Sequence, residues 1–565
     1  MTPGRFRRES FTLALFLSMF GLAVSAKAQT FTLLHTFDDE DADTQQGPFD
    51  AAYPSYPGTL AQGRGGNLFG STPGGGALNA GAVYSMTPGG ISTVLHSFNA
   101  MYNGEGGAPA GLTLGTDGNF YGTTMQGGTS ELGMIFKITP SGTLTVLHSF
   151  TGSDGQYPYA APIQARDGNF YGTTSYYGVA YKLTPSGVFT KLCDLTNAPD
   201  PMAPLLQGID GNFYGTAKEG GTEGYGAVFR LTSAGVVTIV YGFDHTQTHG
   251  SYPIGPVIQG NDGNLYGTTS SGGTYGDGVV FKLTLTGQIT LLHSFDGTDG
   301  SQPMGGLVQA SDGNFYGAAS QGGAKGGGTL FEVTSNGEFS VLYNFLPPNP
   351  WQSNITGANP ELTLLQHTNG LLYGDTNQGG VVPYNASELE GPYNGEGTFY
   401  SWNANLPPFV SLLPTSANEV GASIGMLGQG FTGATEVSFN GASGSFTVVS
   451  DTYMTAIVPS DATTGPVTVT TRKGKLTSNK TFFVVPTISS FSPSSGKAGT
   501  QVVILGSGLT EASEVTFGGV KATAFVVNSA SQITATVPTG ALTGPIAITT
   551  PGGTATSSGT FTVIL

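Results

Sequence analysis

The chain has 565 residues, of which only 10% are charged, and its net charge at pH 7 is −17. This acidic balance argues against nucleic acid and anionic membranes as partners. The sequence holds 90 glycines, 33 prolines and a single cysteine, Cys193; no three-residue glycine period indicates collagen, and no internal disulfide can form. Aromatic residues recur in register with the glycines, which favours an ordered all-β protein with very little helix.

The first 28 residues are predicted to be a secretory signal peptide. Three arginines between residues 5 and 8 precede an apolar run over residues 11–24, and Ala26-Lys27-Ala28 supplies a small-x-small cleavage pattern. The run is shorter than the ~20 residues of a membrane span, so no span is expected after cleavage. Removal of four cations and one anion would leave a mature chain from Gln29 with a net charge of −20.

An acidic segment follows the first predicted strand, Thr30–Phe37. Asp39, Asp41 and Asp43 alternate there, and alternating carboxylates can bind Ca²⁺ through their oxygens. The bidentate Glu of a calcium loop is absent at the expected place. Calcium is therefore the one cofactor candidate, and a solvated acidic loop is the competing interpretation.

One octapeptide then recurs seven times, in forms such as Asp117-Gly-Asn-Phe-Tyr-Gly-Thr-Thr124. The copies are 43 to 57 residues apart and begin at Gly65, Asp117, Asp167, Asp210, Asp262, Asp312 and Asn369. A period near 50 built of short apolar runs and glycine turns is typical of propeller blades. We therefore predict a seven-bladed β-propeller over residues 29–405.

The unit over residues 253–295 shows the expected blade. Strands are predicted at 256–260, 264–269, 279–284 and 288–295, because Asp-Gly and Thr-Gly pairs between apolar runs are hairpin signals. The seventh unit ends at residues 397–402, a copy of the third strand, and Thr30–Phe37 copies the fourth. We expect these two segments to pair and to close the ring, which leaves no unpaired edge.

The connections of each unit predict two different faces. Asp-Gly-Asn turns lie on one face, where we interpret the aspartate as turn chemistry. The other face carries the long, variable loops, and binding is usually found on such loops. Tyrosines in or beside these loops suit a neutral glycan or a peptide, and packing between blades is their alternative role. The binding candidates are Tyr177, Tyr225, His245, His249 and Tyr275.

Beyond Leu406 a new repeat appears, with a period of 79 residues. Its short alternating strands predict two immunoglobulin-like sandwiches, over residues 406–485 and 486–565. The segments 488–496, 499–506 and 515–519 resemble the IPT/TIG family. The first module resembles it less well, because Ala417-Asn418-Glu419 replaces the usual Ser-Gly. The resemblance implies a spacer or adhesion stalk.

The blade repeat itself resembles the Gloeobacter/Verrucomicrobia tandem-repeat family, through Asp-Gly-Asn-Phe-Tyr-Gly-Thr-Thr, Val-Phe-Lys-Leu-Thr and Val-Leu-His-Ser-Phe. The resemblance implies an exported bacterial protein and no assigned activity.

No residue set amounts to a catalytic site. Four histidines, at positions 35, 96, 148 and 293, share one place in the fourth strand, which Cys193 occupies in another unit; a place that accepts both is a packing position. We predict a non-enzymatic, monomeric binding or adhesion protein that is secreted, periplasmic or at the cell surface. The alternatives are a polysaccharide lyase or hydrolase on the same scaffold and a purely structural surface component.

Overall fold

The computed structural model describes residues 29–37, 51–54, 59–99, 106–244, 248–347, 354, 356–380 and 395–564. Within these ranges the protein is all-β, and η1 (Phe431–Gly433), a single 3-10 turn, is the one helical element. The predicted very low helix content is confirmed. No helix in this part of the chain is long and apolar enough to cross a membrane. The signal peptide and Asp39, Asp41, Asp43 and His245 lie outside the described residues.

The described part of residues 30–403 forms seven four-stranded antiparallel sheets that resemble propeller blades, named repeats 1 to 7 below. Repeat 1 is β3 (Ala61–Gln62), β4 (Leu68–Thr72), β6 (Ala82–Met86) and β7 (Ser92–Ser97); repeat 2 is β8 (Gly107–Leu114), β9 (Phe120–Gln126), β10 (Met134–Ile138) and β11 (Leu144–Ser149); repeat 3 is β12 (Ile163–Gln164), β13 (Phe170–Thr174), β14 (Val179–Leu183) and β15 (Phe189–Asp194). Repeat 4 is β16 (Leu206–Gln207), β17 (Phe213–Ala217), β18 (Ala227–Leu231) and β19 (Val237–Gly242); repeat 5 is β20 (Ile258–Gln259), β21 (Leu265–Thr269), β22 (Val279–Leu283) and β23 (Ile289–Ser294); repeat 6 is β24 (Val308–Gln309), β25 (Phe315–Ala319), β26 (Thr329–Val333) and β27 (Phe339–Asn344). A small extra pair joins β2 (Ala51–Ala52) to β5 (Gly74–Gly75).

Repeat 7 is assembled from both ends of this region. Its first three strands are β28 (Leu365–Gln366), β29 (Leu372–Thr376) and β30 (Thr398–Asn403), and its fourth is the N-terminal β1 (Thr30–Thr36). The antiparallel register runs from Thr30 opposite Asn403 to Thr36 opposite Thr398. The expected pairing of residues 30–37 with residues 397–402 is therefore confirmed.

The octapeptide forms the second strand of each repeat, and its residues pack between sheets. In repeat 5 every residue of β21 is buried. Tyr266 on this strand stacks on Phe315 of repeat 6, with ring centroids 4.0 Å apart. Gly267 is required because a Cβ there would lie 2.7 Å from the ring of Phe281. The apolar core therefore consists of layers between neighbouring sheets.

Glutamine side chains tie the first strands of neighbouring repeats together. The carbonyl oxygen of Gln259 accepts a hydrogen bond from the backbone amide of Ile209 in repeat 4, at 3.0 Å. Its amide group donates to the carbonyl of Gly263 in its own turn, at 2.8 Å. The same bond to a backbone amide of the preceding repeat is made by Gln164, Gln207, Gln309, Gln366 and Gln62. Repeat 2 has Leu114 at this position.

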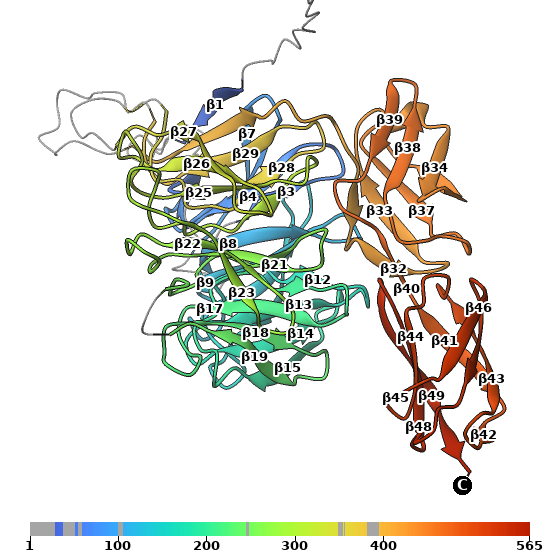
Figure 1. Cartoon of the computed structure of the whole chain (residues 1–565). Helices are drawn as coiled ribbons and strands as arrows, with labels where there is room; N and C mark the ends of the chain where they lie inside the picture. The colour runs from blue at the N-terminus through green and yellow to red at the C-terminus, as the bar shows by residue number, and fades with distance from the viewer. Residues whose placement is uncertain are drawn as a thin grey trace, which may run out of the picture.

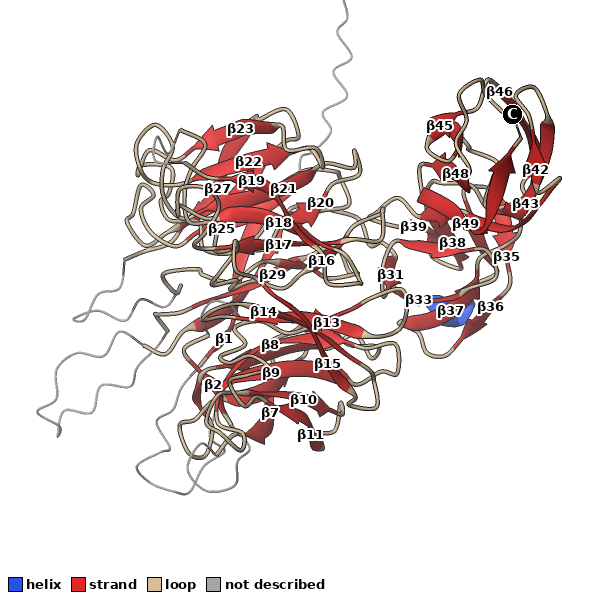
Figure 2. Cartoon of the chain, turned by 90° about the horizontal axis from the view of Figure 1, so that it is seen from below, coloured by secondary structure: helices blue, strands red, loops and turns tan. Residues whose placement is uncertain are grey.

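Two sandwich modules follow, on one side of the blade-like sheets (Figures 1 and 2). The first has sheets in the order β31-β33-β37-β36 and β35-β34-β38-β39 with the pair β32-β40, and the second has β41-β43-β47-β46 and β42-β49-β48-β44-β45. The strands of the first are β31 (Ser411–Leu413), β32 (Ala417–Glu419), β33 (Ser423–Leu427), β34 (Glu436–Phe439), β35 (Ala442–Gly444), β36 (Phe446–Val448), β37 (Tyr453–Ile457), β38 (Val467–Thr471), β39 (Gly474–Thr477) and β40 (Phe483–Val485). Those of the second are β41 (Thr487–Ser492), β42 (Ser495–Gly496), β43 (Gln501–Ser507), β44 (Glu514–Phe517), β45 (Val520–Lys521), β46 (Ala524–Ser529), β47 (Gln532–Thr536), β48 (Gly544–Thr550) and β49 (Gly553–Val563). Each module has its own apolar cluster.

Candidate functional site

The face that carries the Asp-Gly-Asn turns, the turn face, holds carboxylates whose oxygens are already bound. Asp262 accepts hydrogen bonds from the backbone and side-chain nitrogens of Asn264, at 3.1 and 2.8 Å, and from the hydroxyl of Tyr266, at 2.8 Å. Lys282 adds an ion pair at 2.7 Å. Burial acts to raise the pKa of Asp262, but these contacts outweigh it and lower the pKa to about 2. Such an aspartate organises its turn and the tyrosine behind it, as the turn interpretation requires.

The first C-terminal module lies against this turn face. The guanidinium of Arg64 in repeat 1 sits 4.2 Å from the ring centroid of Tyr453, and the backbone carbonyl of Arg64 accepts a hydrogen bond from Thr452 at 2.6 Å. Gln429 donates to the hydroxyl of Thr368 in repeat 7 at 2.9 Å. In repeat 5, Asn261 accepts from the backbone amide of Thr481 at 3.2 Å. The module thus touches repeats 1, 5 and 7 on the turn face, and these contacts do not involve the opposite face, the loop face.

The loop face carries seven residues in the left-handed backbone region, one at the entry to each repeat. Each directly precedes a proline and has a φ between 51° and 59°. Residues before proline normally adopt extended conformations, and bulky side chains at positive φ are uncommon. The seven residues, called the entry ring below, are Tyr53, Ala108, Tyr157, Asp200, Tyr252, Gln302 and Asn359.

Backbone hydrogen bonds hold the entry ring over the junctions between repeats. The amide of Tyr252 donates to the carbonyl of Tyr225 in the preceding repeat at 2.8 Å, and its carbonyl accepts from Ser270 at 3.1 Å. The amide of Tyr53 in repeat 1 donates in the same way to Glu396 of repeat 7, at 2.7 Å. Since both backbone groups of Tyr252 are used, its side chain is what this residue can offer to a ligand.

Four of the predicted binding residues lie in the described loops. Tyr177 and Tyr275 expose 74% and 65% of their surface, whereas Tyr225 is half-buried and packs on Tyr252, with centroids 5.9 Å apart. His249 is half-buried and its Nδ1 lies 3.3 Å from the hydroxyl of Tyr241. No aromatic contact joins Tyr177, Tyr225 and Tyr275 to one another in the described part of the chain.

Tyrosine pairs nevertheless link the entry ring to the variable loops. Tyr157 contacts Tyr176 edge-on at 6.4 Å, and Tyr176 contacts Tyr177 at 4.5 Å. Asp200 accepts a hydrogen bond from the hydroxyl of Ser175 in the neighbouring repeat. Sequence reasoning missed the entry ring, although the recurrent proline ahead of each first strand could have revealed the shared position.

The histidines of the fourth strands are engaged in packing contacts. The ring of His293 stacks on Phe339 at 3.5 Å, and its Nε2 lies 2.8 Å from the carboxylate of Asp299. His148 makes the equivalent contacts with Phe189 and Asp154. Burial raises the pKa of the Cys193 thiol, with a further contribution from Asp194, which disfavours a reactive thiolate. No group of three metal-ligating side chains occurs among the described residues.

Similarity to solved structures is distant. A streptogramin B lyase is 15% identical, with 63% of this chain and 95% of that chain covered and a TM-score of 0.43. A virginiamycin B lyase from Staphylococcus aureus is 13% identical, with 66% and 99% covered and a TM-score of 0.43. A surface glycan-binding protein from Prevotella bryantii is 16% identical, with 32% and 40% covered and a TM-score of 0.21. Likenesses this weak carry no argument about activity.

Family comparisons are more specific. No curated protein matches the chain. Residues 486–563 match the IPT/TIG domain. Residues 55–259 and 201–405 each match the Gloeobacter/Verrucomicrobia repeat, so that the two matches together span more than half of the chain. The protein belongs to the Gloeobacter/Verrucomicrobia repeat family and carries a C-terminal IPT/TIG domain.

Proposed function

We propose that this is an exported surface-binding protein whose loop face holds a neutral glycan. In this proposal the seven repeats form a closed seven-bladed propeller, and both C-terminal modules are IPT/TIG-like sandwiches that serve as a stalk. The equivalent strand orders of the two modules support the second assignment. Closure is supported by the contacts between repeats 7 and 1, which use the same two kinds of hydrogen bond as the other junctions.

One observation carries the proposal: the first module covers the turn face and leaves exposed tyrosines on the loop face. Tyr53, Tyr176, Tyr177 and Tyr275 are each at least 40% exposed. Tyrosine offers a flat apolar ring and a hydroxyl together, which suits the alternating apolar and hydroxyl surfaces of a sugar. The net charge of −17 disfavours an anionic polymer as ligand on this face.

The backbone conformation of the entry ring also favours the loop face as the binding surface. Glycine adopts positive φ without steric cost, yet this glycine-rich chain places no glycine at these seven positions and tyrosine at three of them. A residue held in the left-handed region costs about 1–3 kcal/mol. Side chains kept at that cost are candidates for a binding role.

Affinity electrophoresis of the mature chain in gels that contain neutral polysaccharides tests the proposal. Retardation by at least one polysaccharide is expected, and alanine at both Tyr177 and Tyr275 should abolish it. Val236→Ala, at an exposed residue beside a turn between third and fourth strands, is the control and should bind normally. Binding that survives alanine at Tyr177, Tyr225, His245, His249 and Tyr275 together would contradict the proposal.

The same samples test the remaining assignments. Chromatography of the polysaccharide after incubation should show no shortening, whereas new oligosaccharides would favour the lyase or hydrolase alternative. Mass spectrometry of the native protein should find Gln29 at the N-terminus if the chain is exported. Light scattering should give the mass of a monomer.

A further inference from the structure

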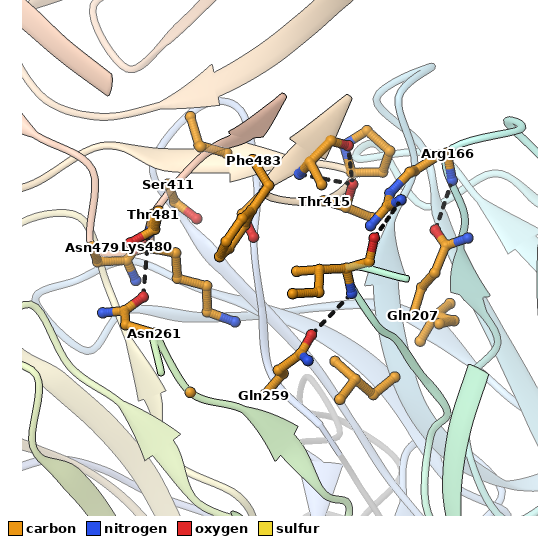
Figure 3. Close-up of a pocket in the computed structure, with 18 of the residues that line it drawn as sticks. Arg166, Gln207, Gln259, Asn261, Ser411, Thr415, Asn479, Lys480, Thr481 and Phe483 are labelled. Carbon is orange, nitrogen blue, oxygen red and sulfur yellow. Dashed lines mark hydrogen bonds between the residues drawn. The ribbon is translucent and has the colours of Figure 1, made fainter. Parts of the chain in front are cut away.

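A cavity of about 230 Å³ lies between the repeats and the first C-terminal module. Its walls are the first strands of repeats 3, 4 and 5 on one side, and β31, β32 and the segment that leads into β40 on the other (Figure 3). A single water needs only about 10–15 Å³ of such volume. The cavity therefore has room for a small solute with its waters.

The charge of this cavity is opposite to that of the whole chain. Its lining includes two cations, Arg166 and Lys480, and neither an Asp nor a Glu among the described residues. The chain as a whole has 36 acidic and 19 basic residues. A cavity with two cations and no acid in such a chain is a local concentration of positive charge, and it favours an anion.

Two cationic donors in this cavity lack a hydrogen-bond partner among the described residues, namely Nε of Arg166 and the ammonium of Lys480. The side chain of Lys480 extends from the module toward Asn261 and Gln259 of repeat 5 (Figure 3). Within the described ranges no ion pair or hydrogen bond of its ammonium is present; its backbone carbonyl alone is used, by Ser478. Burial lowers the pKa of Lys480, which is the usual response of a cation removed from water without a counter-charge.

Two neutral amide side chains near Lys480 already accept hydrogen bonds. The carbonyl oxygen of Gln259 accepts from Ile209, and that of Asn261 accepts from Thr481. Arg166 donates to the carbonyls of Gly208 and Ile209, at 2.8 and 3.2 Å. Its guanidinium is therefore held by the protein through its two terminal nitrogens, while its Nε has no hydrogen-bond partner among the described residues. The ammonium of Lys480 is the other unused donor.

We propose that this cavity binds a small oxyanion, held by the ammonium of Lys480 and attracted by the charge of Arg166. A charge-assisted hydrogen bond to an oxyanion would give the half-buried ammonium a partner of opposite charge. Because the walls come from both the repeats and the module, the bound anion would also strengthen their contact. This site is independent of the glycan site proposed on the loop face.

Thermal denaturation of the mature chain in the presence of anions tests the site. Sodium phosphate, sodium sulfate and sodium glucuronate are titrated against sodium chloride at equal ionic strength. A saturable rise in Tm is expected with at least one of them, because a ligand that binds the folded state alone stabilises it. A response to phosphate or sulfate alone identifies an inorganic anion, and a response to glucuronate identifies a carboxylate.

The Lys480→Met variant should lose this response and should melt above the wild type in chloride, since an unpaired, half-buried charge is removed. Lys475→Met, at an exposed lysine of β39, is the matched control and should keep the full response. An unchanged response of Lys480→Met, or no response of the wild type to any of the three anions, would overturn the proposal.

A second measurement needs no variant at Lys480. Acetylation of individual lysines by acetic anhydride is followed by mass spectrometry with and without the active anion. The anion should slow the modification of Lys480 several-fold and leave that of Lys475 unchanged. Equal slowing at both lysines would place the anion elsewhere and would contradict the site.

Discussion

Gln62 and Thr368 are 306 residues apart in the chain and form two hydrogen bonds with each other. The backbone amide of Thr368 donates to the side-chain oxygen of Gln62 at 3.0 Å, and the side-chain nitrogen of Gln62 donates to the hydroxyl of Thr368 at 2.8 Å. The pair joins repeat 1 to repeat 7. It is the same contact to a backbone amide that Gln164, Gln207, Gln259, Gln309 and Gln366 make at the other junctions.

The Gln62→Leu variant should therefore be less stable by about 1–3 kcal/mol, the cost of leaving a buried amide without a partner. Leucine suits the test because Leu114 stands at this place in repeat 2. Urea unfolding measures the loss, and hydrogen exchange at the Thr368 amide should become faster. The control is Gln288→Leu at an exposed turn; if both variants unfold at the same urea concentration, the bond does not contribute.

The N-terminal strand should contribute to stability through Phe31. Its ring stacks on Tyr343 of repeat 6 at 4.2 Å and on Tyr400 of repeat 7 at 5.2 Å. We expect Phe31→Ala to cost about 3 kcal/mol, at the lower end for truncation of a packed phenylalanine because the side chain is half-buried. Thr32→Ala, at an exposed neighbour on β1, should cost little. Equal melting temperatures of the two variants would contradict a structural role for β1.

The sequence predicted the strands well because each repeat supplies the same information again. The four strands expected in repeat 5 differ from β20 to β23 by at most two residues at either end. The pairing of β1 with β30 was predictable for the same reason, since Thr30–Phe37 copies a fourth strand.

Contacts that depend on distant residues could not be predicted in this way. The module covers the turn face through contacts such as that between Arg64 and Thr452, which are 388 residues apart, and neither residue belongs to a recognisable motif. Tyr252 precedes a proline, a context that favours extended backbone, and only the hydrogen bonds to Tyr225 and Ser270 explain its positive φ. Lys480 likewise becomes distinctive only through its place in the cavity between the repeats and the first module.

Asp375 should be a site at which stability can be gained. It is buried, and neither carboxyl oxygen has a hydrogen-bond partner among the described residues. At the equivalent place in repeat 5, Thr268 donates to the carbonyl of Gly305 at 2.9 Å. Burial, together with the charge of Glu361, raises the pKa of Asp375 well above its usual value. We expect Asp375→Thr to stabilise the protein by about 1–3 kcal/mol at pH 7, the cost of an unsatisfied buried group.

The sign of the pH dependence follows from that raised pKa. The folded state holds the Asp375 proton to higher pH than the unfolded state, whose pKa is near 3.8. The stability that this proton provides is therefore complete below pH 3.8 and is lost as the pH rises toward the folded pKa. The advantage of Asp375→Thr in urea unfolding should be smaller at pH 4 than at pH 7. An advantage that grows as the pH falls would contradict a buried neutral carboxyl.

The entry ring can be tested for strain with two substitutions at Tyr157, whose φ is 52°. Alanine and glycine both remove the ring that contacts Tyr176, but only glycine adopts this φ without a steric cost. The glycine variant should therefore be more stable than the alanine variant by about 1–2 kcal/mol, as measured by urea unfolding. The control is Ala82, a buried residue of β6 outside the left-handed region. There the order should be reversed, so that Ala82→Gly is less stable than the natural chain with alanine, because glycine in a strand is destabilising.

If Tyr157→Gly is less stable than Tyr157→Ala, the position is not strained, and strain gives no reason to assign its tyrosine a binding role. If Tyr157→Gly folds with wild-type stability and loses polysaccharide retardation, the side chain serves the ligand and not the fold.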